Sequence, residues 1–199
     1  MVFELDKLLH GRSVVLASQS PRRQELLKLL FDGFEIIPAQ GEEHIPEGTP
    51  ANDASRILAQ QKCREVAERR PDALVIGCDT TVVVGAEILG KPADEADAAR
   101  MLGLLSGTPH QVISGVCISL EGRESSFSVS TDVEFRQLTP AEIAAYIATG
   151  EPMDKAGAYG IQEKGSLLVK GISGDFFNVV GLPVAELAQQ IQRLLGGET

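Results

Sequence analysis

The sequence predicts an α/β fold built on a mixed β-sheet. Short apolar runs typical of buried strands alternate with longer amphipathic segments, which indicates that strands and helices pack together. Two pairs of strand-like runs are separated by tight glycine turns, at Gly85 and at Glu121-Gly122, and predict hairpins that a purely parallel sheet lacks. With 199 residues, we expect a single domain, residues 1–199, that can divide into two lobes around a cleft.

The N-terminal half begins with a strand followed directly by a helix. Ser20 is a good N-cap, and Pro21 suits the first position of this helix. Pro71 ends the second, longer helix. The leucines expected to face the core from the first helix are Leu26, Leu27, Leu29 and Leu30. The predicted elements are, in order, strand Val14–Ala17, helix Pro21–Leu30, strand Phe34–Pro38, loop Glu42–Pro50 and helix Ala51–Arg69.

The rest of the chain continues this alternation and then becomes rich in glycine. From Glu151 to Pro183 long helical patterns are absent, which is typical of a functional loop region with short strands. The predicted elements are, in order, strand Ala73–Cys78 and its continuation Thr81–Val84, strand Glu87–Leu89, helix Asp94–Leu105, strands Gln111–Leu120 and Ser125–Phe135, a helix that begins at Thr139-Pro140 and ends at Gly150, and helix Val184–Leu195.

Composition and charge argue against several classes of protein. The net charge is -10 without any basic run, whereas binding to a nucleic-acid polymer needs an extended cationic face. No apolar run approaches the roughly 20 residues of a membrane span. Cys63, Cys78 and Cys117 are far apart and form no C-x-x-C pair, which favours buried thiols in a reducing compartment. Since the first residues fit no signal peptide, we expect a cytoplasmic protein without nucleic-acid or membrane partners.

The segment S-Q-S-P-R-R, Ser18–Arg23, raises an electrostatic question. Arg22 and Arg23 fall in the first turn of the predicted helix, where the helix dipole favours negative charge. A strand, a polar turn and a helix N-terminus together form an anion site, to which the Ser18 hydroxyl and the two guanidinium groups would add donors. A bound phosphate would make both cations favourable. The alternative is a pair of exposed arginines, one of them paired with Glu25.

A carboxylate follows the predicted strand Ala73–Cys78. Asp79 is expected at the strand end, where active-site carboxylates of α/β sheets often lie, although a turn aspartate is the alternative. Lys91 could return to the same site as a phosphate clamp or lie on the surface. Gly85–Lys91 nearly matches a P-loop, but Pro92 has no hydroxyl for magnesium, and a hairpin replaces the helix that a P-loop needs.

The segment E-P-M-D-K-A-G-A-Y-G-I-Q, Glu151–Gln162, combines polar residues with glycines. Asp154, Lys155 and Gln162 lie among glycines that let the backbone approach a ligand closely. The Gln162 amide can donate to a base carbonyl and accept from a ring N–H, which matches uracil or thymine. When flipped, it matches cytosine, so its neighbours must fix its orientation. A surface loop with turn glycines is the alternative.

Other chemistries find little support in the sequence. The three histidines lack zinc-site spacing, and neither G-x-S-x-G nor a helix-opening G-x-G-x-x-G is present. What remains is a set of carboxylates, Glu42, Glu43 and Asp79, together with arginine and lysine. Such groups suit a hard divalent cation and phosphate oxygens.

Four motifs in a fixed order resemble the Maf family of nucleotide pyrophosphatases. They are S-x-S-P-R-R-x-E-L-L, C-D-T-x-V with G-K-P, G-E-P-x-D-K-A-G-x-Y-G-I-Q and N-V-V-G-L-P, and they extend over roughly Val14 to Leu195. The resemblance implies an elongated mixed sheet flanked by helices, similar to ITPase-like proteins, with two lobes around a central cleft. It also implies release of pyrophosphate from nucleoside triphosphates, a divalent metal such as Mg²⁺ or Mn²⁺, and a homodimer.

The resemblance also assigns roles to individual residues. Asp79 matches the proton acceptor, and Glu43 matches an acidic position near the metal, for which Asp79 is the other candidate ligand. The resemblance implies a role in substrate specificity for Arg22, Thr80 and Gln162. The resemblance implies that Arg23, Lys62 and Lys91 contact phosphate. The polar turn before the first helix adds the Ser18 hydroxyl to these predicted phosphate ligands.

The loop D-K-A-G-A-Y-G-I-Q resembles that of the subgroup acting on dTTP and UTP. We therefore expect hydrolysis of these or modified pyrimidine triphosphates, by attack of water on the α-phosphorus, with Asp79 activating the water or holding the metal that does. Two alternatives stay open. The substrate could be a methylated or deaminated purine triphosphate, or the protein could be a binding module that regulates cell division and septum formation.

Overall fold

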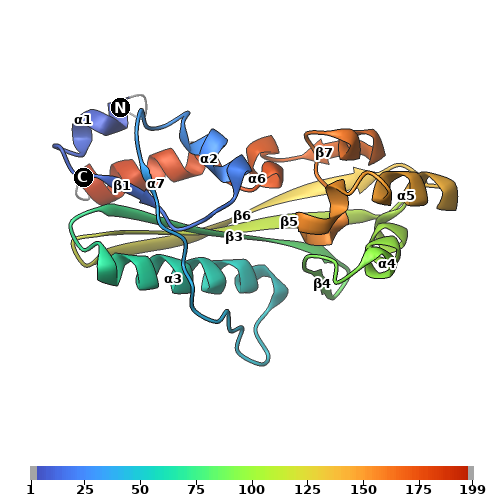
Figure 1. Cartoon of the computed structure of the whole chain (residues 1–199). Helices are drawn as coiled ribbons and strands as arrows, with labels where there is room; N and C mark the ends of the chain where they lie inside the picture. The colour runs from blue at the N-terminus through green and yellow to red at the C-terminus, as the bar shows by residue number, and fades with distance from the viewer. Residues whose placement is uncertain (1–3, 197–199) are drawn as a thin grey trace. The chain divides into compact units, whose positions relative to one another are not determined.

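The computed structural model describes residues 4–196, which form a seven-stranded mixed β-sheet with helices (Figure 1). The strands are β1 (Val14–Leu16), β2 (Glu35–Ile36), β3 (Leu74–Val84), β4 (Glu87–Leu89), β5 (Pro109–Leu120), β6 (Arg123–Phe135) and β7 (Val169–Ser173). The strand order is β2-β1-β3-β5-β6-β7, with β4 paired to β3. Strand β1 pairs in parallel with β2 and β3, whereas the pairs β3–β4 and β6–β7 are antiparallel. The predicted α/β fold with a mixed sheet is confirmed.

Three helices begin directly after a residue whose side chain caps them. The helices are α1 (Leu5–Leu8), α2 (Pro21–Leu27), α3 (Ala51–Arg69), α4 (Glu95–Leu105), α5 (Pro140–Ile147), α6 (Phe176–Val180) and α7 (Val184–Gly196), and the 3-10 segments are η2 (Glu151–Asp154), η3 (Ala156–Ala158) and η4 (Lys164–Leu168). The Ser20 hydroxyl accepts a hydrogen bond from the Arg23 N–H, and Thr139 forms a capping box with Glu142. Among residues 4–196, no helix has the length and apolar character needed to cross a membrane.

The chain divides into two compact units. Within the described residues, unit 1 comprises 4–79, 114–129 and 181–196, and unit 2 comprises 80–113 and 130–180. Strands β3, β5 and β6 each contribute one part to each unit. The single domain with two lobes around a cleft stays a prediction.

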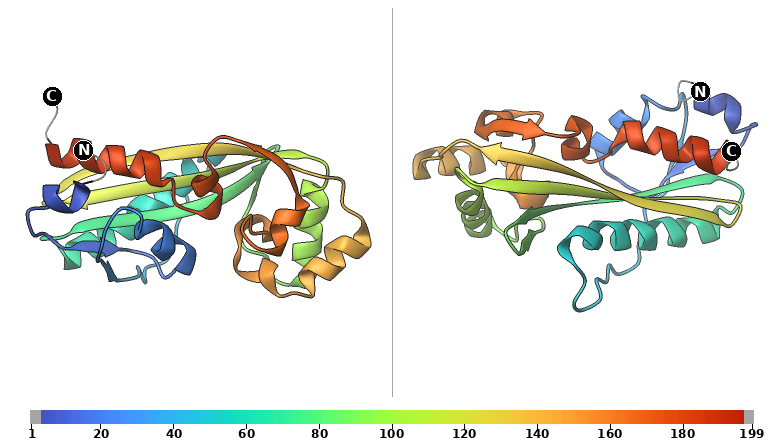
Figure 2. Two further views of the ribbon diagram at one scale, coloured as in Figure 1. Left: turned by 90° about the horizontal axis from the view of Figure 1, so that it is seen from above. Right: turned by 180° about the vertical axis from the view of Figure 1, so that it is seen from behind.

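In unit 1, helix α3 covers one face of the sheet, and α1, α2 and α7 cover the opposite face (Figures 1 and 2). Small residues let α3 approach the strands closely. A Cβ built at Gly77 on β3 would lie 2.4 Å from the Ala59 carbonyl oxygen, and one at Gly115 on β5 would lie 2.2 Å from the Arg56 nitrogen. Only glycine fits at these two positions without displacing the backbone of α3. The two glycines therefore fix how α3 lies on the sheet.

In unit 2, an aromatic cluster lies at the centre of the core. His110, Phe135 and Tyr159 are buried, and their rings meet edge to face. The His110 Nε2 lies 2.9 Å from the Tyr159 hydroxyl. Burial lowers the pKa of His110 to about 4, although its contact with the Thr108 carbonyl opposes the shift. His110 is therefore neutral at physiological pH and belongs to the core.

Three details of the structure correct the sequence predictions. Helix α2 ends at Leu27 instead of Leu30, and the Leu29 side chain is 62% exposed because the buried Phe31 takes the core position after Leu27. The strand expected over Phe34–Pro38 is only the two residues of β2. Asp79 lies within β3 and not at a strand end, because pairing continues through Thr80 and Thr81, whose β-branched side chains suit a strand.

The hairpin predictions are confirmed. β3 and β4 pair across the turn at Gly85, which has a φ of 59°. β5 and β6 are joined by Glu121 and Gly122, both with positive φ, as in the turn type that matches the twist of paired strands. All three cysteines are free and buried, as the sequence predicts. The short helix α6 has no counterpart among the predicted elements.

Candidate functional site

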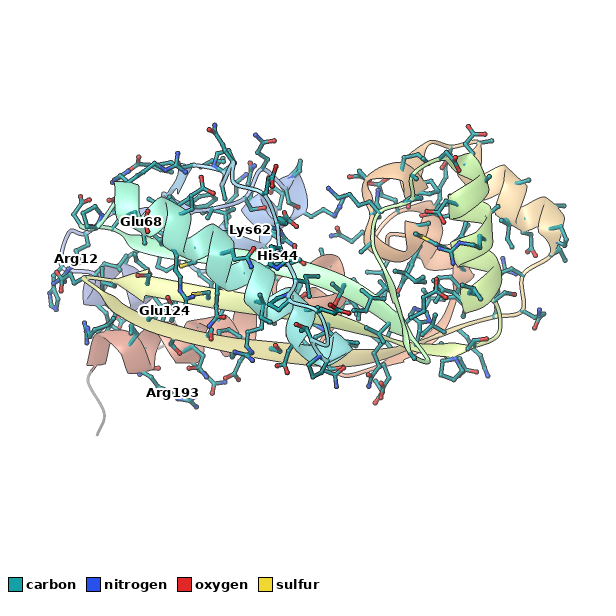
Figure 3. All side chains as sticks on the ribbon, turned by 90° about the horizontal axis from the view of Figure 1, so that it is seen from below. Arg12, His44, Lys62, Glu68, Glu124 and Arg193 are labelled. Carbon is teal, nitrogen blue, oxygen red and sulfur yellow. The ribbon has the colours of Figure 1, made fainter. Side chains whose placement is uncertain are left out.

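A half-buried ion pair joins helix α3 to strand β3 within unit 1. The Lys62 ammonium donates to the Asp79 carboxylate at 2.5 Å and lies 2.9 Å from the Glu43 carboxylate. The side chains of Lys62 and Asp79 are 16% and 14% exposed, whereas that of Glu43 is 53% exposed. The close approach of α3 to Gly77, two residues before Asp79, brings the two partners together. Figure 3 shows Lys62 on α3 near His44 of the preceding loop.

The ionisation of Lys62 is set by opposing effects. Burial of the ammonium lowers its pKa, but attraction to Asp79 and hydrogen bonds to Asp79 and Glu43 outweigh this, so that the pKa is raised above its ordinary value of 10.5. Lys62 is therefore protonated at physiological pH. A single cation then lies between two carboxylates at the middle of β3.

Arg23 ties three segments of unit 1 together. Its Nη1 donates to the Cys78 carbonyl at 2.8 Å and to the Ser18 hydroxyl at 3.2 Å, and its Nε donates to the Gly181 carbonyl at 3.0 Å. These bonds explain how a cation is accommodated in the first turn of α2, because its side chain reaches two carbonyl oxygens and a hydroxyl. The Cys78 carbonyl belongs to the peptide that precedes Asp79. Arg23 thus helps to fix the backbone at the carboxylate.

The Cys78 thiol lies beside the same group. Its Sγ donates to the Gly181 carbonyl at 3.2 Å. Burial raises the pKa of this thiol, against the nearby charge of Arg23. A thiol with a raised pKa is a poor nucleophile, so Cys78 is structural.

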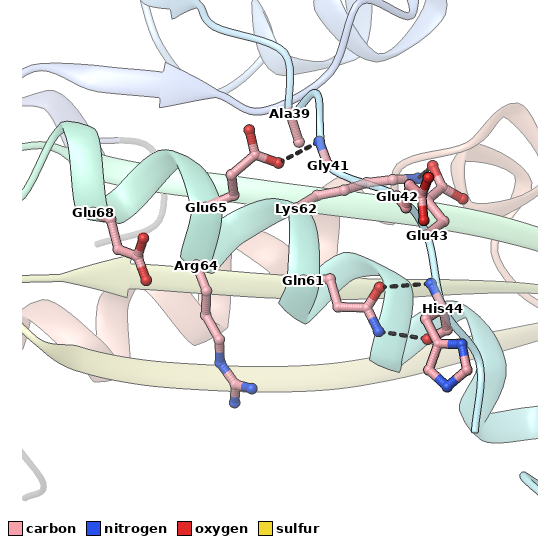
Figure 4. A pocket seen from close by; sticks show the side chains of 10 residues that line it. All are labelled: Ala39, Gly41, Glu42, Glu43, His44, Gln61, Lys62, Arg64, Glu65 and Glu68. Atoms are coloured by element: carbon pink, nitrogen blue, oxygen red, sulfur yellow. Dashed lines mark hydrogen bonds and ion pairs between the residues drawn. The ribbon is translucent and has the colours of Figure 1, made fainter.

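The loop before α3, residues 39–44, is held against the helix by two side chains (Figure 4). The Glu65 carboxylate accepts hydrogen bonds from the N–H groups of Gln40 at 2.9 Å and Gly41 at 2.9 Å. The Gln61 amide accepts from the His44 N–H at 3.0 Å and donates to the His44 carbonyl. Together they place Glu43 beside Lys62. A pocket of about 390 Å³ lies between this loop and α3 and is lined by charged side chains that include Glu43 and Lys62.

A second loop in unit 2 is held by a comparable device. The Glu151 carboxylate accepts from the N–H groups of Lys164 and Gly165, each at 3.1 Å. It also accepts from the Tyr146 hydroxyl at 2.9 Å, and this hydroxyl accepts from the Gly160 N–H at 3.2 Å. Burial of Tyr146, together with the Glu151 charge, raises the pKa of its phenol, which stays protonated. The segment Gly160–Gly165, which contains Gln162, is therefore fixed at both ends.

The structure brings part of the predicted site together. Within unit 1, direct contacts join Lys62 to Glu43 and Asp79, and join Arg23 to Ser18 and to the peptide before Asp79. The predicted residues that lie elsewhere are Arg22, half-buried next to Arg23 on α2, and Thr80, Lys91 and Gln162, all in unit 2. Thr80 adjoins Asp79 along β3. The approach of Lys91 and Gln162 to Asp79 stays a prediction.

Sequence reasoning missed the residues that hold the two loops. Gln61 and Glu65 are half-buried on α3, and their bonds to loop N–H groups follow no short sequence pattern. Glu151 is the first residue of the glycine-rich segment Glu151–Gln162, and this position was the signal that could have indicated its role in holding the loop. In the sequence, nothing distinguishes Tyr146 from an ordinary core residue of α5.

The carboxylates of the site fit a divalent cation in chemical type. Glu43 and Asp79 already converge on one positive charge, that of Lys62, and carboxylate oxygens are the ligands that Mg²⁺ and Mn²⁺ take. Among residues 4–196, no group of three or more histidine, cysteine, aspartate or glutamate side chains is arranged to hold a metal. Two carboxylates plus substrate phosphates are a common arrangement for magnesium.

Comparison with known proteins gives consistent matches over almost the whole chain. The model of the family described as Maf-like protein matches residues 13–194. A "dTTP/UTP pyrophosphatase" of Bacillus velezensis is 49% identical over 91% of this chain and 96% of its own length. A protein of the same name from a Geobacillus species is 48% identical over 92% of this chain and 98% of its own length. Among solved structures, the Staphylococcus aureus Ham1 protein matches with a TM-score of 0.48 and 18% identity, over 62% of this chain and 72% of that one.

Proposed function

We propose that this chain, which belongs to the Maf-like protein family, is a pyrophosphatase that hydrolyses dTTP and UTP to the nucleoside monophosphate and pyrophosphate. The structural observation that carries the proposal is the half-buried Lys62–Asp79 pair with Glu43 at its edge. The names of relatives with nearly half of their residues identical over more than nine-tenths of the chain support the same substrates.

In the proposed reaction, water attacks the α-phosphorus, and the bond between this phosphorus and the bridging oxygen breaks as pyrophosphate leaves. Such a reaction depends mainly on positioning and on neutralising phosphate charge. Asp79 accepts the proton of the attacking water or helps to hold the metal. Lys62, Arg23 and Lys91 supply positive charge to the phosphates, and Ser18 supplies a hydroxyl.

A divalent metal is part of the proposal. Glu43 and Asp79 would hold Mg²⁺ or Mn²⁺, which would neutralise charge on the phosphate oxygens. Substrate specificity is assigned to Arg22, Thr80 and Gln162. A homodimer and a cytoplasmic location stay predictions, and three free, buried cysteines are compatible with a reducing compartment.

The decisive experiment measures pyrophosphate release from a panel of nucleoside triphosphates with Mg²⁺ or Mn²⁺. We expect dTTP and UTP to be the preferred substrates, and the variant Asp79→Asn to lose about 10²–10⁴-fold in rate, as for the loss of a general base. Asp72→Asn, which removes an exposed carboxylate of unit 1, serves as the matched control and should retain the wild-type rate. Hydrolysis of dTTP at the wild-type rate by Asp79→Asn would contradict the assignment of Asp79 to the active site. Preference for a methylated or deaminated purine triphosphate would contradict the proposed substrate.

A further inference from the structure

The segment Gly160–Gly165 forms a loop whose two ends are in contact. A Cβ built at Gly165 would lie 2.2 Å from the Gly160 carbonyl oxygen and 2.6 Å from the Tyr146 hydroxyl. A Cβ built at Gly160 would lie 2.6 Å from Cε of the buried Lys155. Gly165 therefore has room for glycine only, whereas a side chain at Gly160 would have to displace that of Lys155. The backbone between them is confined by contacts at its base.

Glu151 holds both ends of this segment. It accepts directly from the N–H groups of Lys164 and Gly165, and it reaches Gly160 through the Tyr146 hydroxyl. The main-chain carbonyl of Glu151 accepts from the Lys155 ammonium at 2.7 Å. Hydrogen bonds to a carboxylate are stronger than those between neutral groups, so one side chain determines the path of the whole segment.

The side chains in the segment point to different surroundings. Ile161 is 8% exposed and packs inward, whereas the adjacent Gln162 is exposed. The placement of Gln162 therefore depends on its backbone and not on packing of its own side chain. This placement matters because a glutamine amide matches thymine and uracil in one orientation and cytosine in the other.

We infer that Glu151, together with Tyr146, is a positioning residue for Gln162 and thereby determines discrimination between thymine or uracil nucleotides and cytosine nucleotides. This inference rests on the proposed function and deepens it. Glu151 touches neither the nucleotide nor the reacting phosphate in this role. It acts through the backbone that carries Gln162.

The test compares dTTP with dCTP in the full-length protein. In Glu151→Gln, an amide NH₂ replaces one carboxylate oxygen and faces a backbone N–H, so at least one bond to Lys164 or Gly165 is lost. We expect the KM for dTTP to rise about tenfold and the preference for dTTP over dCTP to fall about tenfold, the effect of losing one charged hydrogen bond. The kcat for dTTP should stay within about twofold, since the proposed catalytic groups are unchanged.

Controls separate positioning from general damage. Glu134→Gln removes an exposed carboxylate of unit 2 that pairs with Lys170, and should leave both the KM and the preference unchanged. Tyr146→Phe should shift the preference in the same direction as Glu151→Gln. In a Gln162→Ala background, Glu151→Gln should cause no further loss of preference, because no amide remains to be oriented. Amide hydrogen exchange at Lys164 and Gly165 should become faster in Glu151→Gln.

The outcomes distinguish the two proposals. A wild-type protein that releases no pyrophosphate from dTTP overturns the proposed function. An active wild type whose preference for dTTP survives Glu151→Gln, while exchange at Gly165 becomes faster, overturns the positioning role alone. A further loss of preference in the Gln162→Ala background also overturns it. If Gln162→Ala itself leaves the preference unchanged, the segment does not read the base, and the positioning role is rejected.

Discussion

The two units hold a loop by the same means in different surroundings. In unit 1, Glu65 accepts two successive backbone N–H groups of the loop 39–44, and in unit 2, Glu151 accepts two successive N–H groups of the loop 160–165. The unit 1 contacts are exposed to solvent. The unit 2 contacts include a buried tyrosine, Tyr146, and a glycine without room for a side chain, Gly165. A carboxylate can therefore order a loop in both places, but burial decides how much stability depends on it.

Among these changes, a substitution at Gly165, which lies against the Gly160 carbonyl oxygen, should cause the largest loss of stability. In Gly165→Ala, the new methyl group would overlap the Gly160 carbonyl oxygen, which cannot move away without breaking the segment. We expect the free energy of unfolding to fall by about 3–5 kcal/mol. Denaturant unfolding measures this, with Gly171→Ala on β7 as the control, because nothing lies within 4 Å of its Cβ position. Equal stability of the two variants would show that the segment is not confined.

The buried polar groups of unit 2 should also make the protein sensitive to mild acid. The pKa of His110 is about 4 in the folded protein and about 6.5 when unfolded, so the unfolded chain binds this proton more tightly. The contribution of His110 to stability is complete above pH 6.5 and is lost as the pH falls toward 4. Near pH 4 the loss should be on the order of 3 kcal/mol.

Thermal unfolding of the wild type and His110→Gln between pH 7 and pH 4 measures this loss. Glutamine can still bond to the Tyr159 hydroxyl but does not titrate in this range. The wild type should therefore lose more stability than the variant as the pH falls. If the stability of the wild type and of the variant fell equally with pH, protonation of His110 would not destabilise the folded protein.

The exposed contact in unit 1 should give the smallest effect on global stability. The pKa of Glu65 is lowered by the N–H groups of Gln40 and Gly41, so its carboxylate is ionised at neutral pH. We expect Glu65→Gln to reduce the free energy of unfolding by about 1 kcal/mol or less and to speed amide exchange at Gln40 and Gly41. Glu68→Gln, on the same helix and lining the same pocket, is the control. A loss as large as that of Gly165→Ala would remove the distinction between the two loops.

The fold was predictable wherever local signals and packing agree. Ser20 and Pro21 correctly mark the start of α2, the helix over Ala51–Arg69 has the expected bounds, and the turn at Glu121-Gly122 joins two strands as expected. The signals fail where a tertiary contact decides. The leucine run predicts three further helical residues in α2, but Phe31 takes the core position and leaves Leu29 exposed.

The candidate site was predictable only in its residue types. Asp79 and Glu43 were indicated by the sequence pattern as well as by the resemblance to a family, and Lys62 by the resemblance alone. Only the structure shows that the three residues meet in one ion-paired group. The local pattern also placed Asp79 at a strand end, because it left Asp79 and Thr80 outside the strand, although it predicted that the strand continues over Thr81–Val84. The loop anchors Glu65 and Glu151 were not found, since their partners are backbone N–H groups that any sequence supplies.

The glycine contacts of α3 have a mechanical consequence for the ion pair. Sliding the helix by a single residue would shift Lys62 by about 1.5 Å along the axis and rotate it by about 100°. Gly77 and Gly115 oppose such a slip, because the backbone of α3 lies directly against both strands and a one-residue shift would bring different side chains against them. The two glycines therefore favour the register that places Lys62 opposite Asp79. Because Gly77 and Gly115 have no side chains, α3 lies on the sheet in the register that aligns Lys62 with Asp79.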